Sequence, residues 1–359
     1  MPSERFTVPD ELAVRVPQQI MRATVEGILR TQGLSDADAI QAADTLLYAD
    51  LRGIDSHGVS NMFPIYMHWF RQGFINPTAE PTVIREAAAV ATVDDGGGLG
   101  LATGPRAMDL AIAKAEQCGI GAVSVTNGRH YGAAGYHAHR AVPHNMIGVS
   151  MTIGGLMVVP TFGSKPMVGL NPIAVAVTGG RLADFVFDAS MSSVAGNKIR
   201  IAQRLGANVL PGWISDGAGN PIMTETAVPE TWWMLPTGGV RDGGSHKGYS
   251  LAMMVDVLCG VLGGDPPGFI RPSGDVSHHF MAYRIDAFCD RDEFSDHMET
   301  FLTGLIETPP AAEGDRVVYA GLVAHETERD RRENGIPYHP DVVRYFRDLA
   351  SEVGAATEL

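Results

Sequence analysis

The feature that most constrains the fold is an alternation of short β-like runs with alanine-rich helices, which begins at Thr82 and continues to about residue 190. Alternation of this kind is typical of α/β or α+β cores, in which helices pack on a sheet. A stretch rich in glycine and proline follows, and we expect it to be irregular over 206–244. The periodicity of apolar residues predicts helices over 103–117 and 132–141, and strands over 121–126, 146–153, 173–177 and 185–188.

Helical periodicity dominates both ends of the chain. The second N-terminal helix is expected to begin at the N-cap Ser35 and to end before Gly53. A later helix over 248–262 is interpreted as a buried core helix, because it is apolar on almost every side. The other predicted elements are helices over 17–31, 36–51, 59–72, 293–306 and 341–352, and a strand over 317–323.

The composition and the charge argue against several classes of protein. A net charge of −14 disfavours a nucleic-acid-binding protein, which needs a basic face. The longest apolar run, 251–262, is shorter than the roughly 20 residues that span a membrane, and the first residues lack the apolar core of a signal peptide. The three cysteines, Cys118, Cys259 and Cys289, match neither a disulfide framework nor a CxxC motif. We therefore expect a cytoplasmic protein that binds neither nucleic acid nor a membrane.

The stretch Asp50-Leu-Arg-Gly-Ile-Asp-Ser-His-Gly58 concentrates polar side chains between two predicted helices. Ser56 and His57 fall near the first turn of the following helix, where the helix dipole favours anions and opposes protonation of an imidazole. A neutral imidazole beside a hydroxyl and the guanidinium of Arg52 could transfer a proton while a carboxylate is held nearby. The alternative is structural: Asp55 or Ser56 would cap the helix, and His57 would be a partly buried neighbour.

A second polar cluster, Asn127-Gly-Arg-His-Tyr-Gly-Ala-Ala-Gly-Tyr-His137, follows a predicted strand and opens a helix. Loops in this position often carry catalytic residues, and their glycines let the backbone approach a ligand closely. His130 is the candidate here for catalysis or substrate binding, with packing of the loop as the alternative. His130, His137, His139 and His144 do not match the spacing of a zinc site, and we predict no metal.

Two further stretches suggest ligand contacts. Gly243-Gly-Ser-His-Lys-Gly-Tyr249 leads into a helix, so it combines backbone N–H groups, a helix dipole and the charge of Lys247, which suits a phosphate. Asp188 lies near the C-terminal end of a predicted strand, where open sheets bind ligands, although it could equally cap a helix. No GxGxxG motif follows a strand, since Gly96-Gly-Gly-Leu-Gly100 has the wrong spacing, so the Rossmann fingerprint is absent.

Taken together, five motifs resemble the malate/L-lactate dehydrogenase family of the non-Rossmann type. Relatives in this family include sulfolactate, ureidoglycolate and diketogulonate dehydrogenases and the piperideine- and pyrroline-2-carboxylate reductases. The motifs occur in the family order between about Asp50 and Asn334, and they are DLRGIDSHG, NGRHYGAAGYHA, GLNP, FDASMS and GGSHKGYSLAMMVDVLCGVLGG.

The resemblance implies a cytoplasmic homodimer of NAD(P)-dependent oxidoreductase subunits that acts on a small carboxylic acid. It also implies an α/β (mixed α+β) fold with a non-Rossmann mixed-sheet cofactor domain. Three regions are expected: a helical N-terminal unit (1–75), a cofactor- and substrate-binding core (76–325), and C-terminal helices (326–359) that pack on the N-terminal unit.

The same resemblance implies roles for individual residues. His57 would be the proton donor with Ser56 beside it, His130 the second active-site histidine, and Asp188 an orienting partner. The substrate-binding candidates are Arg52, Asn61 and Arg129. The cofactor-binding candidates, for NAD or NADP, are Asn171, Pro172, Ser190, His246, Lys247, His325 and Glu326.

Departures from the family pattern concern the substrate most. Many relatives follow the SHG motif with an arginine at the place of Asn61, whose amide can hydrogen-bond a carboxylate but cannot form a bidentate ion pair. Either Arg52 or Arg129 would then bind the carboxylate, or the substrate is not a simple 2-keto acid. The leading hypothesis is hydride transfer between NAD(P)H and a small 2-hydroxy or 2-keto carboxylic acid. Reduction of a cyclic imine is the second hypothesis, and a non-catalytic cofactor-binding protein is the third.

Overall fold

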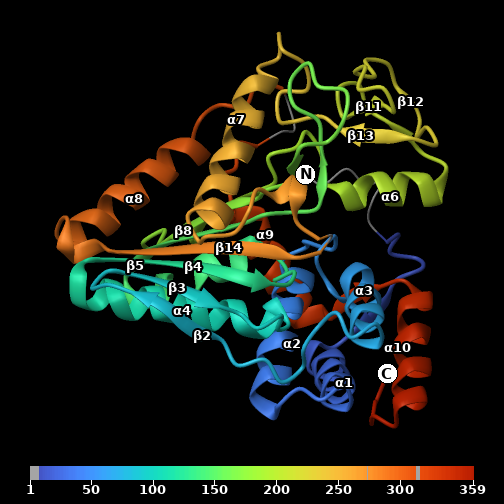
Figure 1. Ribbon diagram of the computed structural model, residues 1–359, viewed down its shortest axis with the longest axis horizontal. Helices are drawn as coiled ribbons and strands as arrows, with labels where there is room; N and C mark the ends of the chain where they lie inside the picture. Colours follow the sequence, from blue (N-terminus) through green and yellow to red (C-terminus); the bar gives the residue numbers. More distant parts are fainter. Residues whose placement is uncertain (1–7, 273, 313–315) are drawn as a thin grey trace.

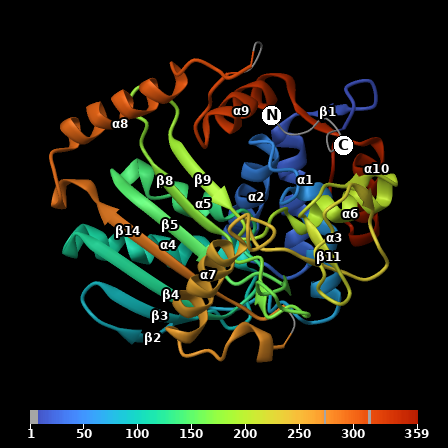
Figure 2. The same ribbon diagram turned by 90° about the horizontal axis from the view of Figure 1, so that it is seen from above.

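A seven-stranded sheet forms the centre of the molecule (Figures 1 and 2). The computed structural model describes residues 8–272, 274–312 and 316–359. Among the described strands of this sheet, only β3 and β4 run parallel, and the other five neighbouring pairs are antiparallel. This arrangement confirms the mixed α/β fold and differs from a doubly wound parallel sheet. In spatial order the strands are β2 (Thr82–Glu86), β3 (Val90–Asp94), β4 (Ile120–Gly128), β14 (Val276–Arg284), β5 (Met146–Thr152), β8 (Ile173–Val177) and β9 (Phe185–Ala189).

Helices α4 (Gly100–Cys118) and α5 (Ala134–His139) share one buried core with the sheet, and α4 lies beneath the strands in Figure 1. Both helices agree with the predicted ones. Glycine allows β4 and α4 to pack closely, because a Cβ on Gly121 would lie 1.9 Å from the carbonyl oxygen of Ala111. Strand β4 therefore runs directly against α4, and its C-terminal end delivers the His130 loop to a fixed place.

The N- and C-terminal segments share a second core (blue and red in Figure 1). Strand β1 (Val14–Val16) pairs with β15 (Ile336–Tyr338), and the ring centroids of Phe63 and Phe346 lie 5.0 Å apart. The predicted N-cap is present, since the Ser35 hydroxyl accepts a hydrogen bond from the backbone N–H of Asp38 (3.1 Å). The domain boundaries themselves stay a prediction. The helices of this unit are α1 (Gln18–Thr31), α2 (Asp36–Leu51), α3 (Val59–Arg71), α9 (Leu322–Asn334) and α10 (Pro340–Val353).

A smaller part of the molecule is built on short strands (upper right in Figure 1). Residues 206–244 were expected to be irregular, but they contain strands of two or three residues, which are too short to give a sequence signal. Helix α6 (Gly196–Leu205) packs here through Ile199 and Ala202. The strands form two sheets, one of β10 (Asn208–Val209) and β12 (Thr226–Ala227), the other of β11 (Ile214–Asp216), β13 (Trp232–Met234), β6 (Leu156–Val158) and β7 (Val168–Gly169).

The sequence analysis did not predict β14, although it is the central strand. Its sequence carries adjacent histidines where an alternating apolar pattern would signal a strand. Both are buried because each imidazole bonds a hydroxyl on a neighbouring strand, His278 to Thr152 (2.7 Å) and His279 to Ser124 (2.9 Å). The strand predicted over 317–323 is wrong, since helix α9 begins at Leu322.

Helix α7 (Ser245–Asp256) continues as a π-helical segment, η3 (Val257–Val261), on the face of the sheet opposite α4. Its buried side is narrow and consists of small side chains such as Ala252 and Cys259. The interpretation of this segment as a buried core helix is therefore wrong. Its outer apolar side chains are exposed, Val257 by 53% and Leu262 by 61%. Helix α8 (Arg291–Ile306) lies over the same face. No helix in the described part of the chain is long and apolar enough to cross a membrane.

Candidate active site

The loop between α2 and α3 is locked by a buried carboxylate. Asp50, on the last turn of α2, accepts hydrogen bonds from the backbone N–H of Val59 and from the hydroxyl of Tyr338, both at 3.1 Å. Asp50 thus caps α3, a role that the sequence analysis considered only for Asp55 or Ser56. A Cβ on Gly58 would lie 1.8 Å from an Asp50 carboxylate oxygen, so the SHG motif requires glycine at this position. These contacts restrict the conformation of the loop, which places His57 just before helix α3.

Contacts from distant segments hold the outer side of this loop. Arg331 of α9 forms an ion pair with Asp55 (2.7 Å) and also bonds the carbonyl oxygen of Asp50. From α6, the side-chain amide of Asn197 donates to the carbonyl oxygen of Ser56 (2.6 Å). Neither Arg331 nor Asn197 was identified from the sequence, because both lie far from the loop along the chain. The helical unit and the small-sheet region therefore both position Ser56 and His57.

The structure brings the two predicted histidines together. The imidazole rings of His57 and His130 are nearly parallel, with 13° between their planes and 5.8 Å between their centroids. The Nδ1 atom of His57 lies 2.9 Å from the Ser56 hydroxyl, and Nδ1 of His130 lies 2.6 Å from the Tyr66 hydroxyl. Tyr66, on α3, was not predicted as a site residue. The rings are close enough for one small substrate to contact both.

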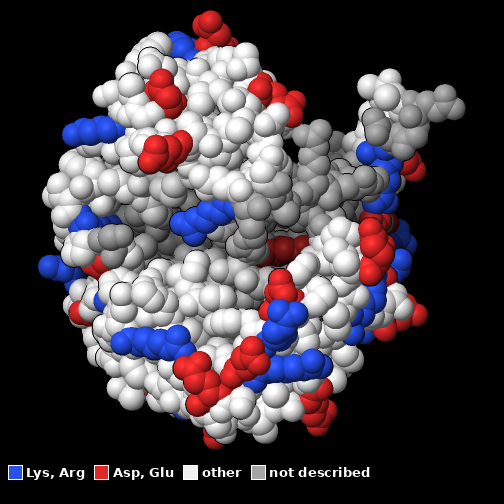
Figure 3. Space-filling view, turned by 90° about the vertical axis from the view of Figure 1, so that its right-hand side faces the viewer, with Lys and Arg blue, Asp and Glu red and all other residues white. Residues whose placement is uncertain are grey.

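Burial keeps both imidazoles neutral. Loss of hydration lowers the pKa of His57 to about 4. It lowers the pKa of His130 to about 3, with smaller contributions from His57 and His278. Yet both residues are half-buried and keep part of their surface accessible to solvent. Figure 3 shows that the molecule is hollowed between its upper and lower parts, with Lys and Arg interspersed among Asp and Glu around it.

Asp188 lies at the end of β9, as predicted, but it does not bond either histidine among the described contacts. Its carboxylate accepts a hydrogen bond from the N–H of Gly135 (2.7 Å) in the first turn of α5, which is the capping alternative. Asp188 keeps an exposed surface, but the protein packed around it removes part of its hydration and raises the pKa of Asp188 to about 6, against the lowering effect of the Gly135 bond. A role in orienting a histidine stays a prediction.

The three predicted substrate-binding side chains already have partners. Arg52 is buried in an ion pair with Glu328 (2.9 Å), and Arg129 pairs with Asp275 (3.0 Å). The amide of Asn61 donates to the carbonyl oxygen of Asp55 (2.7 Å). Binding of a substrate carboxylate by any of them would require these bonds to be exchanged.

The GLNP turn and the neighbouring serine are also occupied by contacts within the chain. Asn171 is fully buried with a positive φ of 43°, and its side chain bonds Gly154, the carbonyl of Ala252 and Asp256 at 2.8–3.0 Å. These bonds tie the turn, which includes Pro172, to helix α7. Ser190 bonds the hydroxyl of Ser192 (3.0 Å). A contact of Asn171 or Pro172 with a cofactor would thus be made through the backbone or the ring edge.

The N-terminus of α7 gathers positive charge beside a pocket. Lys247 is exposed, and Nδ1 of His246 lies 2.9 Å from the guanidinium of Arg241, which was not predicted. Partial desolvation and the charges of Arg241 and Lys247 lower the pKa of His246. The pocket is lined by parts of residues 159–163, 219–221 and 235–245, and within the described part of the chain no side chain caps this helix end. The backbone N–H groups of Ser245 and Lys247 already bond carbonyl oxygens, so it is the positive end of the helix dipole together with the cations that suits a diphosphate.

His325 and Glu326, the last predicted cofactor contacts, lie on the first turns of α9. Glu326 forms an ion pair with Arg316, and His325 is exposed. No described contact joins either residue to the α7 terminus. Within residues 8–272, 274–312 and 316–359, no group of three His, Cys, Asp or Glu side chains could hold a metal ion.

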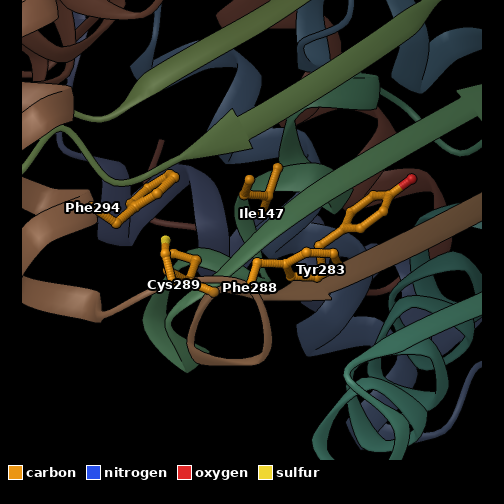
Figure 4. Close-up of a pocket in the computed structure, with 6 residues that line it drawn as sticks. Ile147, Tyr283, Phe288, Cys289 and Phe294 are labelled. Carbon is orange, nitrogen blue, oxygen red and sulfur yellow. The ribbon is translucent and has the colours of Figure 1, made fainter.

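A second pocket lies at the other end of the sheet (Figure 4). It is lined by Ile147, Tyr283 and Phe294 together with Ile285, Phe288 and Cys289. Tyr283 pairs with Ile147 and Ile120, whereas the histidine site follows Gly128, eight residues along β4. At about 3.3 Å per residue the two places are roughly 25 Å apart. This apolar pocket is therefore separate from the histidines.

Comparisons with known proteins agree with this architecture. The sequence model of the malate/L-lactate dehydrogenase family matches residues 16–347. A malate dehydrogenase of Pyrococcus abyssi is 35% identical over 352 residues, which cover 96% of each chain. An L-sulfolactate dehydrogenase of Methanocaldococcus jannaschii is 30% identical over 337 residues, or 92% of this chain and 95% of that one. The crystal structure of a malate dehydrogenase from Entamoeba histolytica matches with a TM-score of 0.91 at 28% identity, covering 97% of this chain and 100% of that chain.

Proposed function

The chain belongs to the malate/L-lactate dehydrogenase family, and on that premise we propose that it transfers a hydride between NAD(P) and a small 2-hydroxy or 2-keto carboxylic acid. The observation that carries the proposal is the pair of neutral, half-buried imidazoles that lie side by side, with the Ser56 hydroxyl on Nδ1 of His57. Oxidation of an alcohol requires a group that removes the hydroxyl proton, and reduction requires the same group to return it.

His57 is proposed as that group. Its low pKa leaves the imidazole unprotonated near pH 7, ready to accept the proton of a substrate hydroxyl. An anionic substrate beside the ring would favour the imidazolium and so raise the pKa of His57, which allows the proton to be held until it is returned. The bonds that fix the loop keep the ring in place, so little ordering is left to the moment of reaction.

The α7 terminus fits the cofactor. Lys247, Arg241 and the positive end of the helix dipole would bind the diphosphate that NAD and NADP share, and Asn171 would keep the GLNP turn against α7. When bound, the nicotinamide supplies or accepts the hydride. The protein supplies orientation, exclusion of water and the proton.

A cyclic imine or ketimine carboxylate is the second candidate substrate. Asn61 stands where the family resemblance expects an arginine, its amide is bonded to Asp55, and Arg52 is paired with Glu328, so the loop offers no unpaired guanidinium to a second carboxylate. A substrate with one carboxylate and a ring nitrogen would need less positive charge than a dicarboxylic keto acid.

A homodimer in a reducing compartment completes the proposal. The exposed apolar side chains of α7 and η3, with Phe269 and Ile270 beyond them, form the kind of surface that a second copy would cover. The three cysteines are free, which agrees with a cytoplasmic setting. Sedimentation analysis would measure the subunit number directly.

Oxidation of NADH and NADPH should be followed with a panel of 2-keto acids and cyclic imines. Turnover with keto acids supports the leading proposal, and turnover with imines alone supports the second candidate. Binding that changes the nicotinamide fluorescence without turnover of any compound would indicate a non-catalytic cofactor-binding protein. A protein that leaves the fluorescence of both cofactors unchanged would contradict all three.

A further inference from the structure

We propose that the two histidines of the site have separate roles that their Nδ1 partners fix. His57 transfers the proton, whereas His130 keeps its hydrogen on Nε2 and donates a hydrogen bond to the substrate oxygen. This division rests on the proposed function and deepens it. It makes Tyr66 a positioning residue for His130.

The tautomer of His130 follows from its contacts. Its Nδ1 accepts a hydrogen bond from the backbone N–H of Gly132 (3.3 Å), and an N–H group can only donate. Nδ1 is therefore unprotonated, and the neutral ring carries its hydrogen on Nε2. The Tyr66 hydroxyl, 2.6 Å from Nδ1, then also donates. For Nε2 of His130 to act as a base, the hydrogen would have to move to Nδ1, where it would face the Gly132 N–H, which cannot accept it.

His57 has no such restriction. Its Nδ1 lies 2.9 Å from the Ser56 hydroxyl, which can donate to a bare nitrogen or accept from an N–H. Either neutral tautomer and the imidazolium all keep a hydrogen-bond partner. A proton can therefore enter and leave Nε2 of His57 without loss of that bond, as acid–base catalysis requires.

The backbone around His130 is clamped as well. The carbonyl oxygens on its two sides are each bonded by a buried imidazole, that of Arg129 by His278 (3.1 Å) and that of Tyr131 by His137 (2.8 Å). The Tyr131 ring is stacked between these two imidazoles, at 4.2 Å from His137 and 4.5 Å from His278. The backbone on both sides of His130 is therefore held in place. His137 and His278 are positioning residues in the same sense.

Glutamine substitutions separate the two roles, because the Nε2 amide of glutamine can donate a hydrogen bond but cannot carry a proton between substrate and solvent. We expect His130→Gln to keep kcat within about 10-fold of the unmodified enzyme, while His130→Ala loses about 10²-fold, as for a lost oxyanion donor. His57→Gln should be as slow as His57→Ala. The reverse pattern, an active His57→Gln enzyme and an inactive His130→Gln enzyme, would overturn the assignment.

Nitrogen-15 NMR of histidine-labelled, full-length enzyme gives a readout that does not depend on turnover. The expected spectrum at about pH 7 shows His130 as the Nε2–H tautomer. Tyr66→Phe keeps the Gly132 bond and should keep the Nε2–H tautomer, but the loss of the 2.6 Å bond to Tyr66 should free the ring to turn, which lowers kcat with the cofactor KM unchanged. An unchanged kcat in Tyr66→Phe would remove Tyr66 from its positioning role.

The two proposals can fail separately. An Nδ1–H tautomer of His130 in the unmodified protein would refute the division of roles whatever the activity. Absence of turnover with every keto acid and imine, together with the Nε2–H tautomer, would refute the proposed function and leave the geometry of His130 as inferred.

Discussion

The two ends of the proposed site are built in opposite ways. At the histidine end, both Nδ1 atoms have partners within the chain, and the Asp50 carboxylate and the stacked Tyr131 hold the loops. At the N-terminus of α7, the Lys247 side chain is exposed and has no described ion pair, while the imidazole of His246 lies 2.9 Å from the guanidinium of Arg241.

This difference follows from what each end has to do. A group that transfers a proton needs a defined protonation state and direction before the substrate arrives, and burial with fixed partners provides both. Cations that bind an anion gain most when they stay hydrated and unpaired until the ligand replaces the water. Changes at the histidine end should therefore alter kcat and folding stability, and changes at the α7 end should alter the cofactor KM.

The free energy of unfolding should fall as the pH is lowered, because buried histidines are neutral in the folded chain. Burial lowers the pKa of five histidines to about 3 or 4, so the unfolded chain binds these protons below about pH 6.5 and the folded chain does not. Burial also raises the pKa of Asp50, Asp95 and Asp188 to about 6 or 7, which acts in the opposite direction. The histidines outnumber the carboxyls, so the unfolded chain binds more protons near pH 5; because Asp188 is exposed and two of the histidines are only half-buried, the expected loss of stability is roughly 1–3 kcal/mol per pH unit. The five histidines are His57, His130, His137, His278 and His279.

Denaturant unfolding at about pH 7, 6 and 5 measures this slope. Because buried groups cause it, the slope should persist in about 0.5 M salt, which screens surface charges. A free energy of unfolding that is flat or rises toward pH 5 would mean that the histidine end is hydrated and far less rigid than described.

His57→Ala should be the most damaging single change to turnover. Loss of the proton-transfer group should lower kcat by at least about 10²-fold, with the cofactor KM within about twofold, because the α7 end is untouched. His144→Ala removes an imidazole on the surface and serves as the matched control. Full turnover by His57→Ala on its best substrate would move the acid–base role elsewhere.

Local chemistry predicted most of this molecule from the sequence. The helices with apolar stripes and caps, such as the one that begins after Ser35, and the strands 173–177 and 185–189 were predicted close to their observed bounds. Each of His57 and His130 was also singled out by the polar residues that concentrate around it at a helix or strand end, whereas their grouping in one site was implied only by the family resemblance. In these cases the signal lies within a few residues of the feature.

Contacts between distant segments escaped prediction. Strand β14 is stable because His278 and His279 find hydroxyls on neighbouring strands, and no local pattern shows such pairing. Tyr66, Asn197 and Arg331 enter the site from α3, α6 and α9, and a buried tyrosine or arginine gives no sequence signal of its own. Helix α7 was misjudged because an exposed apolar face and a buried one look alike in a sequence.

The smallest expected effect is that of a substitution at the N-terminus of α7. Lys247→Ala removes one cation from a solvent-exposed anion site, so it should raise the KM for NADH or NADPH by about 10-fold, the scale of one charge-assisted hydrogen bond, and leave kcat within about twofold. Lys247→Arg should restore most of the affinity. Arg344→Ala removes an exposed cation on α10, paired with Asp341, and should change neither constant. A Lys247→Ala enzyme with a lower kcat and an unchanged KM would contradict this comparison. Lys247 would then act only in the transition state and not in cofactor binding, so the α7 end would not be a site for binding alone.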